Sequence, residues 1–233
     1  MQKIKKPQAK VQEVGNLPYP NKQIIEDIDI IASKILKQQG KNRYRDHFFP
    51  QLINELGLKT GAEIGVDKGE FSLHILSRSN INKYFCIDTW QDNFGSDYKP
   101  NYYNSDGNVR FQEASKTLQK FIDEQKVEMI MERSTEASNK FENDSFDFVY
   151  IDGDHSLEGI MFDLYSWVKK VRIGGIVSGH DYKDGMNSGI NDYFGKQLDY
   201  AVQTAVNYYC KRYGHKLNIV GGRILSWWFV RNI

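Results

Sequence analysis

The sequence predicts an α/β fold in which helices cover both faces of a doubly wound, mostly parallel sheet. Three observations lead to this fold class. Short apolar runs alternate with segments of helical periodicity. Acidic and histidine residues follow two consecutive apolar runs. Near the C-terminus, two apolar runs follow each other with no helical segment between them. The chain has 233 residues, of which 40% are hydrophobic. This length suits one well-buried domain with some decoration and would be cramped for two.

The bulk composition limits the classes of partner. The 31 Lys and Arg nearly balance the 30 Asp and Glu, and no long basic run is present, so we expect no nucleic-acid partner. No stretch approaches membrane-spanning length, and the start, MQKIKKPQAK, lacks the apolar core of a signal peptide. We therefore expect a cytoplasmic protein without a membrane partner.

Cys86 lies in an apolar run and Cys210 in a helical pattern, which favours buried free thiols over a disulfide scaffold.

The N-terminal region differs from the rest of the chain. Residues 1–22 are polar, include three prolines and show no sustained period, which predicts a flexible arm. Residues 23–58 contain two helical patterns, one from Ile24 to near Gly40 and one over Phe48–Leu56. We expect these helices to pack on a core domain that spans residues 59–233.

Strand-like and helix-like segments alternate through the core domain. Apolar runs predict strands at Ala62–Val66, Tyr84–Ile87, Val127–Met131, Phe146–Ile151 and Ile176–Ser178. Three- and four-residue spacings predict helices at Phe71–Leu76, Phe111–Ile122, near Thr135, at Leu157–Val171 and at Ala201–Tyr213. Such alternation is typical of parallel strands that are connected by helices.

The C-terminal pattern predicts an antiparallel hairpin. Two apolar runs, Leu217–Val220 and Ile224–Val230, are separated by a few residues that include a Gly-Gly pair. With this hairpin the sheet has seven strands and is Rossmann-like. The alternating Trp227, Trp228 and Phe229 are expected in the core or on an oligomer face, so a homo-oligomer stays open.

Acidic and histidine residues follow the fourth and fifth predicted strands. Asp152, Asp154 and His155 come after the first of these strands, and His180 and Asp181 come after the second. The right-handed crossover between parallel strands brings both strand ends to the same edge of the sheet. We therefore expect these five side chains to face one crevice.

A glycine-containing loop follows the first predicted strand. Its pattern is Glu63-x-Gly65-x-x-x-Gly69, which allows a sharp turn next to the free amide groups of a helix N-terminus. The GxGxxG pattern of dinucleotide sites is missing, which favours a ligand without a pyrophosphate. Asp88 ends the second strand, where an acid is suited to accept hydrogen bonds from two ribose hydroxyls. In the alternative interpretation, the glycines only form a tight turn and Asp88 is a solvated loop acid.

These features together resemble the class I S-adenosylmethionine-dependent methyltransferases, from about Gly61 to Ile233. The segments IDGDHSLEGIMFDLYSWVKKVRIGGIVSGHDY and AVQTAVNYYC are similar to the branch with IDGDHxYEG and GGxxxGHDY motifs followed by a helix close to AVxxFC. The resemblance implies S-adenosylmethionine as cofactor. Leu157 stands where this branch usually has an aromatic residue, so no stacking role is assigned to it.

The resemblance also implies roles for single residues. The cofactor-binding residues would be Glu63, Gly65 and Gly69 at the methionine end and turn, Asp88 at the ribose, Ser134 near the adenine, and Asp152. Metal-dependent sugar and catechol O-methyltransferases resemble this layout, which implies Asp152, His180 and Asp181 as metal ligands. Oxygen donors with one imidazole suit Mg²⁺ or Mn²⁺ better than Zn²⁺.

Three residues are candidates for the general base of a hydroxyl acceptor. Asp154 and His155 follow the first implied ligand, and His180 competes with them. In the alternative interpretation, Asp154 caps the helix that starts near Ser156, and His180 is a hydrogen-bonded partner of that cap. The aromatic-rich segment Thr89–Tyr103 is either a lid over the acceptor or an auxiliary core.

The sequence therefore predicts a methyltransferase that modifies a hydroxyl group of a saccharide or another small molecule, with Mg²⁺ or Mn²⁺ as a candidate metal. Two alternatives stay open, namely a metal-independent N-methyltransferase and a non-catalytic methyltransferase-like binding module. The missing GxGxxG pattern disfavours a third, a nucleotide-sugar or NAD-binding protein.

Overall fold

The computed structural model describes residues 22–41, 44–91, 106–184, 190–191, 197–198, 201–221 and 224–233. Its main sheet consists of β1 (Thr60–Ile64), β2 (Lys83–Asp88), β3 (Val127–Met131), β4 (Phe146–Ile151), β5 (Val171–Gly179), β8 (Asn218–Gly221) and β9 (Leu225–Val230). The helices are α1 (Lys22–Gln39), α2 (Arg45–Glu55), α3 (Glu70–Arg78), α4 (Gly107–Asp123), α5 (Ser134–Ser138), α6 (Leu157–Trp167) and α7 (Val202–Tyr213). A short pair, β6 (Ile190–Asn191) and β7 (Gln197–Leu198), lies apart from this sheet. The predicted arm lies outside the described residues except for Lys22, which begins α1.

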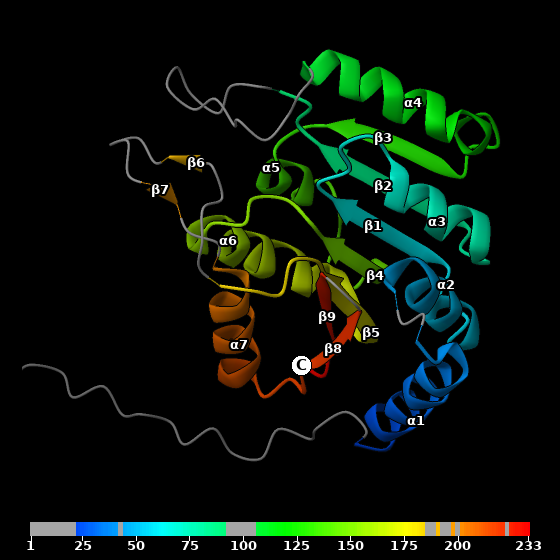
Figure 1. Cartoon of the computed structure of the whole chain (residues 1–233), viewed down its shortest axis with the longest axis vertical. Helices are drawn as coiled ribbons and strands as arrows, with labels where there is room; N and C mark the ends of the chain where they lie inside the picture. The colour runs from blue at the N-terminus through cyan, green and yellow to red at the C-terminus, as the bar shows by residue number, and fades with distance from the viewer. Residues whose placement is uncertain are drawn as a thin grey trace, which may run out of the picture.

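The seven strands have the order β3-β2-β1-β4-β5-β9-β8 (Figure 1). The pairs β1–β2, β1–β4, β2–β3 and β4–β5 are parallel, whereas β9 is antiparallel to both β5 and β8. The predicted seven-stranded, mostly parallel sheet with a C-terminal hairpin is therefore confirmed.

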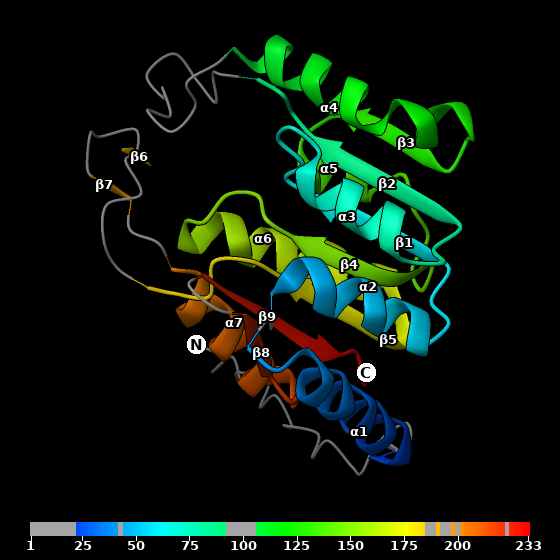
Figure 2. The same ribbon diagram turned by 45° about the vertical axis from the view of Figure 1, so that its right-hand side comes forward.

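The central strands are buried on both faces because helices cover both sides of the sheet. On β4, Phe148 and Tyr150 pack into the core under α1 to α4, while Val149 and Ile151 pack against α5 to α7. Figure 2 shows the two helical layers on either side of the sheet. This two-sided burial explains why β4 reads as a continuous apolar run rather than as an alternating one.

The two N-terminal helices complete one face of the sheet. Phe48 and Phe49 of α2 are fully buried, and the ring of Phe49 lies 5.4 Å from that of Tyr150. Helix α2 starts at Arg45, three residues before the predicted start at Phe48. Its first turn is polar, so apolar periodicity could not mark it. The division of the chain at residues 22 and 58 stays a prediction.

Two expectations for the crossover were wrong in detail. Val171 was expected in the helix but lies in β5, because α6 ends at Trp167 and a 3₁₀ turn, Val168–Lys170, leads into the strand. Leu157 was expected on the apolar face but is 51% exposed as the first residue of α6. By contrast, Trp227, Trp228 and Phe229 are buried in the core, one of their two expected places.

Within the described part of the chain, none of the helices has the length and apolar character needed to cross a bilayer.

An acidic side chain lies inside the core beneath α3. Glu63 of β1 is 2% exposed and accepts hydrogen bonds from Ser72 Oγ at 2.5 Å and from the Tyr84 hydroxyl at 3.4 Å. Burial raises the pKa of Glu63 to about 8, although the hydrogen bond from Ser72 acts in the opposite direction. The folded protein therefore holds Glu63 as a neutral carboxylic acid at neutral pH.

We expect Glu63→Gln to gain stability relative to the native chain as the pH is raised from 5 to 8. In the unfolded chain Glu63 ionises near 4.5, whereas in the folded chain it ionises near 8. The native carboxyl therefore makes folding less favourable as the pH rises through this window, and glutamine does not. The difference in the free energy of unfolding, measured by urea denaturation, should change by on the order of 3–4 kcal/mol. Glu124→Gln at an exposed position is the control, and a pH-independent difference for Glu63→Gln would contradict the assignment.

Candidate active site

The candidate site lies at the carboxyl ends of β1, β2, β4 and β5. These strands are parallel, so their ends share one edge of the sheet. Asp88 ends β2, Asp152 follows β4, and Asp181 follows β5 closely. The structure thus brings three acids from segments that are distant in sequence to one edge of the sheet, as the strand pattern predicts.

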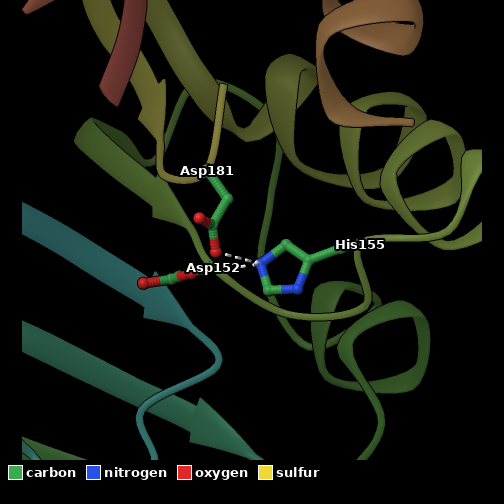
Figure 3. A group of neighbouring side chains, drawn as sticks. All are labelled: Asp152, His155 and Asp181. Carbon is green, nitrogen blue, oxygen red and sulfur yellow. Dashed lines mark hydrogen bonds and ion pairs between the residues drawn. The ribbon is translucent and has the colours of Figure 1, made fainter. Parts of the chain in front are cut away.

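His155 bridges two of the predicted acids. Its Nε2 atom lies 3.3 Å from Asp152 Oδ1 and 3.3 Å from Asp181 Oδ2. Figure 3 shows the Asp181 carboxylate pointing at the imidazole from the end of β5, with Asp152 on the same side of the ring. All three side chains are largely buried. We call Asp152, His155 and Asp181 the acid–histidine cluster.

His180 lies next to this cluster. Its Nδ1 atom is 3.5 Å from Asp152 Oδ2 and 3.7 Å from Asp181 Oδ2. The backbone holds it in place, because the His180 amide donates to the Ile151 carbonyl and its own carbonyl accepts from Trp227 Nε1. His180 therefore contacts the carboxylates rather than a helix cap.

Asp154 has a different role in the structure from the other predicted residues. Its Oδ1 accepts from the Ser156 amide at 2.9 Å, and Ser156 Oγ accepts from the Gly159 amide at 3.0 Å. Ser156 is thus the N-cap of α6, and Asp154 fixes the turn before it. This observation supports the helix-capping interpretation of Asp154. Its role as a base stays a prediction.

Arg45 contacts the acid–histidine cluster, although the sequence did not predict it as a site residue. Its Nη1 lies 2.9 Å from Asp152 Oδ2 and donates to the Tyr150 hydroxyl at 3.1 Å. Its guanidinium also lies 4.8 Å from the centre of the Phe71 ring. A single arginine in the polar first turn of α2 belongs to no motif, so only the packing of α2 on the sheet identifies it.

The charges in the cluster determine how its members titrate. Burial would raise the pKa of Asp152, but hydrogen bonds from His155 and His180 and the charge of Arg45 outweigh it and hold that pKa well below its ordinary value. Burial likewise opposes the charge of His155, but Asp152 and Asp181 outweigh it and raise its pKa. The structure therefore favours an ionised carboxylate at Asp152 and a basic imidazole at His155.

The glycine loop lets β1 approach β4 closely. Gly65 has a φ of 86°, and a Cβ atom there would lie 2.1 Å from the carbonyl oxygen of Asp152. No side chain fits in that space, so glycine is required for the strand ends to meet. Gly69 has a φ of 78° and is the N-cap of α3. The sheet edge thus carries a tight loop directly beside the acid–histidine cluster.

Asp88 organises this loop. Its Oδ2 accepts from the amides of Val66 at 2.8 Å and Asp67 at 2.9 Å, and its Oδ1 accepts from the Trp90 amide at 2.9 Å. It is therefore not simply a solvated loop acid. Since a carboxylate offers about four acceptor positions, about one remains for a ligand hydroxyl, where the sequence suggested two.

One residue of the aromatic-rich segment is part of the core. Trp90 is buried, its Nε1 donates to the Asp67 carbonyl at 2.8 Å, and its ring lies 5.1 Å from that of Phe111. For Trp90 the auxiliary-core interpretation applies. The other aromatic residues of the segment, Phe94, Tyr98, Tyr102 and Tyr103, lie outside the described residues.

Ser134 is held by a buried acid that the sequence analysis missed. Ser134 Oγ donates to Asp163 Oδ1 and accepts from Trp167 Nε1, the latter at 2.8 Å. Burial raises the pKa of Asp163 to about 7, while the hydrogen bond from Ser134 lowers it. The sequence does contain a signal for Asp163, because it is an acid on the otherwise apolar face of α6, between Ile160 and Trp167.

Glu63, which the resemblance places at the methionine end of the cofactor, is 2% exposed in the structure. It lies on β1 two residues before Gly65, and its carboxyl contacts Ser72 and Tyr84 in the core. The assignment of a cofactor contact to Glu63 therefore stays a prediction, while its observed contacts support the start of α3.

The donor atoms of the cluster have the spacing of a cation site. One ligand atom from each of Asp152, His155 and Asp181 lies within 4.8 Å of the others. This set contains His155 where the sequence suggested His180. Two carboxylates and one imidazole suit Mg²⁺ or Mn²⁺ in chemical type, and Asp152 Oδ1 faces the cluster while Oδ2 faces Arg45.

Solved structures share the fold at low sequence identity. The chain is similar to a Staphylococcus aureus protein assigned as a caffeoyl-CoA O-methyltransferase, with a TM-score of 0.57 and 17% identity over 87% of this chain and 91% of that one. It is also similar to an O-methyltransferase from Bacillus cereus in complex with SAH, with a TM-score of 0.54 and 14% identity over 94% and 95% of the two chains. None of the curated proteins matches the sequence significantly.

A family model described as a methyltransferase domain matches residues 62–182, which is more than half of the chain. The matched residues contain the glycine loop, Asp88 and the whole acid–histidine cluster. The chain therefore belongs to this methyltransferase-domain family and is a class I S-adenosylmethionine-dependent methyltransferase.

Proposed function

We propose that this methyltransferase modifies a hydroxyl group of a small molecule, with a saccharide as the favoured acceptor. The observation that carries the proposal is the imidazole of His155, held between Asp152 and Asp181 beside the glycine loop. The O-methyltransferase names of the similar Staphylococcus aureus and Bacillus cereus proteins support the choice of oxygen as acceptor. The aromatic-rich sequence Thr89–Tyr103 supports a sugar, because aromatic rings suit the faces of sugar rings.

The residues at the sheet edge fit the chemistry of S-adenosylmethionine. Asp88 retains about one acceptor position for a ribose hydroxyl, and Gly65 and Gly69 keep the loop free of side chains. Asp152 and Arg45 offer both signs of charge to the amino-acid end of the cofactor. When bound, S-adenosylmethionine supplies an electrophilic methyl group on a sulfonium sulfur.

His155 can provide the acid–base step that a hydroxyl acceptor needs. An alcohol oxygen becomes a competent nucleophile when its proton is removed, and a positioned imidazole contributes about 10²–10⁴-fold to the rate of such a step. In its neutral form, with the Nε2 proton directed at the two carboxylates, His155 would accept the hydroxyl proton at Nδ1. Asp152 and Asp181, both 3.3 Å from Nε2, would stabilise the resulting imidazolium.

A divalent cation is the second candidate source of activation. Asp152, His155 and Asp181 would hold Mg²⁺ or Mn²⁺, which would orient the acceptor oxygen and lower the pKa of its hydroxyl. In that case His180, 3.5 Å from Asp152, would be the remaining imidazole for the proton. The spacing of the donor atoms favours this variant, whereas the positive charge of Arg45, 2.9 Å from Asp152 Oδ2, disfavours a second cation there and favours transfer without a metal.

We expect Asp88→Ala to weaken the binding of S-adenosylhomocysteine (SAH) by at least about tenfold. The substitution removes the acceptor for the ligand hydroxyl and leaves the amides of Val66, Asp67 and Trp90 without their partner. Isothermal titration calorimetry with SAH measures the effect, and Asp123→Ala on the surface of α4 is the control. Equal affinity in the Asp88 variant and the native chain would count against the cofactor position.

We expect His155→Gln to reduce methyl transfer by about 10²–10⁴-fold with SAH affinity nearly unchanged. The imidazole acts on the acceptor proton, whereas the cofactor contacts remain in place. Transfer of a labelled methyl group to a panel of sugars and other hydroxylated compounds gives the rate. His47→Gln on α2 is the matched control, and a His155 variant with native rates would exclude His155 as the base.

The metal variant of the proposal predicts that EDTA lowers the rate at least about tenfold and that added Mg²⁺ or Mn²⁺ restores it. Asp181→Asn should then raise the Mg²⁺ concentration needed for half-maximal rate, because it removes one charged donor. Glu124→Asn at an exposed position controls for the loss of a surface charge. Rates that EDTA leaves unchanged would favour transfer without a metal, with His155 as the base.

A further inference from the structure

Arg45 reaches the acid–histidine cluster from α2, which lies outside the matched region 62–182. Its side chain is 27% exposed, so the guanidinium is partly desolvated but still open to a ligand. It lies between the end of β4, through Asp152 and Tyr150, and the start of α3, through Phe71. Since α3 follows the glycine loop directly, Arg45 stands on the cofactor side of the site.

Only part of the guanidinium is used within the protein. Nη1 makes both hydrogen bonds, to Asp152 and Tyr150, and Nε forms a 3.6 Å ion pair with Asp46. Among the residues that the structure describes, Nη2 has no hydrogen-bond acceptor. The edge formed by Nη2 and Nε, whose ion pair with Asp46 is longer than a hydrogen bond, is therefore the one that a planar anion could approach for a two-point contact.

The cation is also held rigidly. Its guanidinium lies 4.8 Å from the ring centre of Phe71 and 5.7 Å from that of Tyr150. Burial opposes its charge, but Tyr150 and Asp152 outweigh this and raise its pKa, so Arg45 is permanently charged. A fixed cation needs little reorganisation when a ligand binds, which favours affinity.

We propose that Arg45 binds the carboxylate of the methionine moiety of the cofactor, while Asp152 faces its ammonium group. An α-amino acid carries both charges on one carbon, and the Arg45–Asp152 ion pair at 2.9 Å presents the complementary charges side by side. An arginine and a carboxylate can make two parallel hydrogen bonds, which explains why a free Nη2 edge suits this group. The proposal rests on the cofactor side of the proposed function and not on the nature of the acceptor.

A pair of ligands that differ only in the carboxylate tests the proposal. SAH and its decarboxylated analogue, S-adenosyl-3-thiopropylamine, are titrated into the native chain and into Arg45→Gln by calorimetry. The native chain should bind SAH about tenfold to hundredfold more tightly than the analogue, the range expected for hydrogen bonds between charged groups. In Arg45→Gln the two affinities should become nearly equal, mainly because SAH binding weakens.

Two further variants guard against a general structural effect. Arg78→Gln removes another arginine, on α3, that contacts α2 through the Asp46 carbonyl, and it should keep the native preference for SAH. Arg45→Lys keeps the charge and the aliphatic stem but not the planar fork, so it should show an intermediate preference even if the glutamine variant unfolds.

The outcomes separate this proposal from the assignment of the cofactor. If the native chain bound neither ligand, the cofactor assignment itself would fail. If the native chain bound both ligands equally, or if Arg45→Gln and Arg45→Lys kept the full preference for SAH, only the role of Arg45 would be overturned. In that second case, a raised KM for the acceptor in the Arg45 variants would assign the cation to the acceptor instead.

Discussion

The charge of Asp152 is the constraint on which the site depends. The carboxylate is largely buried at the end of β4, where an unpaired charge would cost several kcal/mol. Arg45 from α2, His155 from the loop before α6 and His180 from the end of β5 all approach it. Because each partner belongs to a different segment, the buried charge of Asp152 links α2 to the loop after β4 and to the end of β5. The same grouping produces the candidate catalytic chemistry.

The backbone around Asp152 is constrained as strictly as its side chain. The Asp152 amide donates to the Ile64 carbonyl at 2.7 Å, and Gly65 follows with no room for a Cβ atom. The end of β1 and the end of β4 are therefore locked in register where the glycine loop begins. Asp88 then fixes the loop amides from the neighbouring strand. The glycine loop and the acid–histidine cluster are thus built on one edge of the sheet rather than on separate loops.

Three buried acids in this protein show how the surroundings decide ionisation. Glu63 and Asp163 have only neutral hydrogen-bond partners, and burial raises their pKa values to about 8 and about 7. For Asp152 burial acts in the same direction, but two imidazoles and Arg45 overcome it and lower the pKa. Glu63 contacts Ser72 of α3, and Asp163 of α6 accepts from Ser134, which in turn accepts from Trp167 Nε1. The ionised acid remains available for chemistry.

The sequence by itself determined the order of strands and helices, the C-terminal hairpin, and the sheet edge at which Asp88, Asp152 and Asp181 meet. These features follow from apolar periodicity and from the handedness of parallel crossovers, which are local or general rules. Only the tertiary structure decided that Arg45 pairs with Asp152, 107 positions away, and that His155 rather than His180 completes the cation-like spacing. These contacts depend on where α2 packs and on the directions of the side chains. Neither property produces a periodic pattern of residues that could be recognised in the sequence.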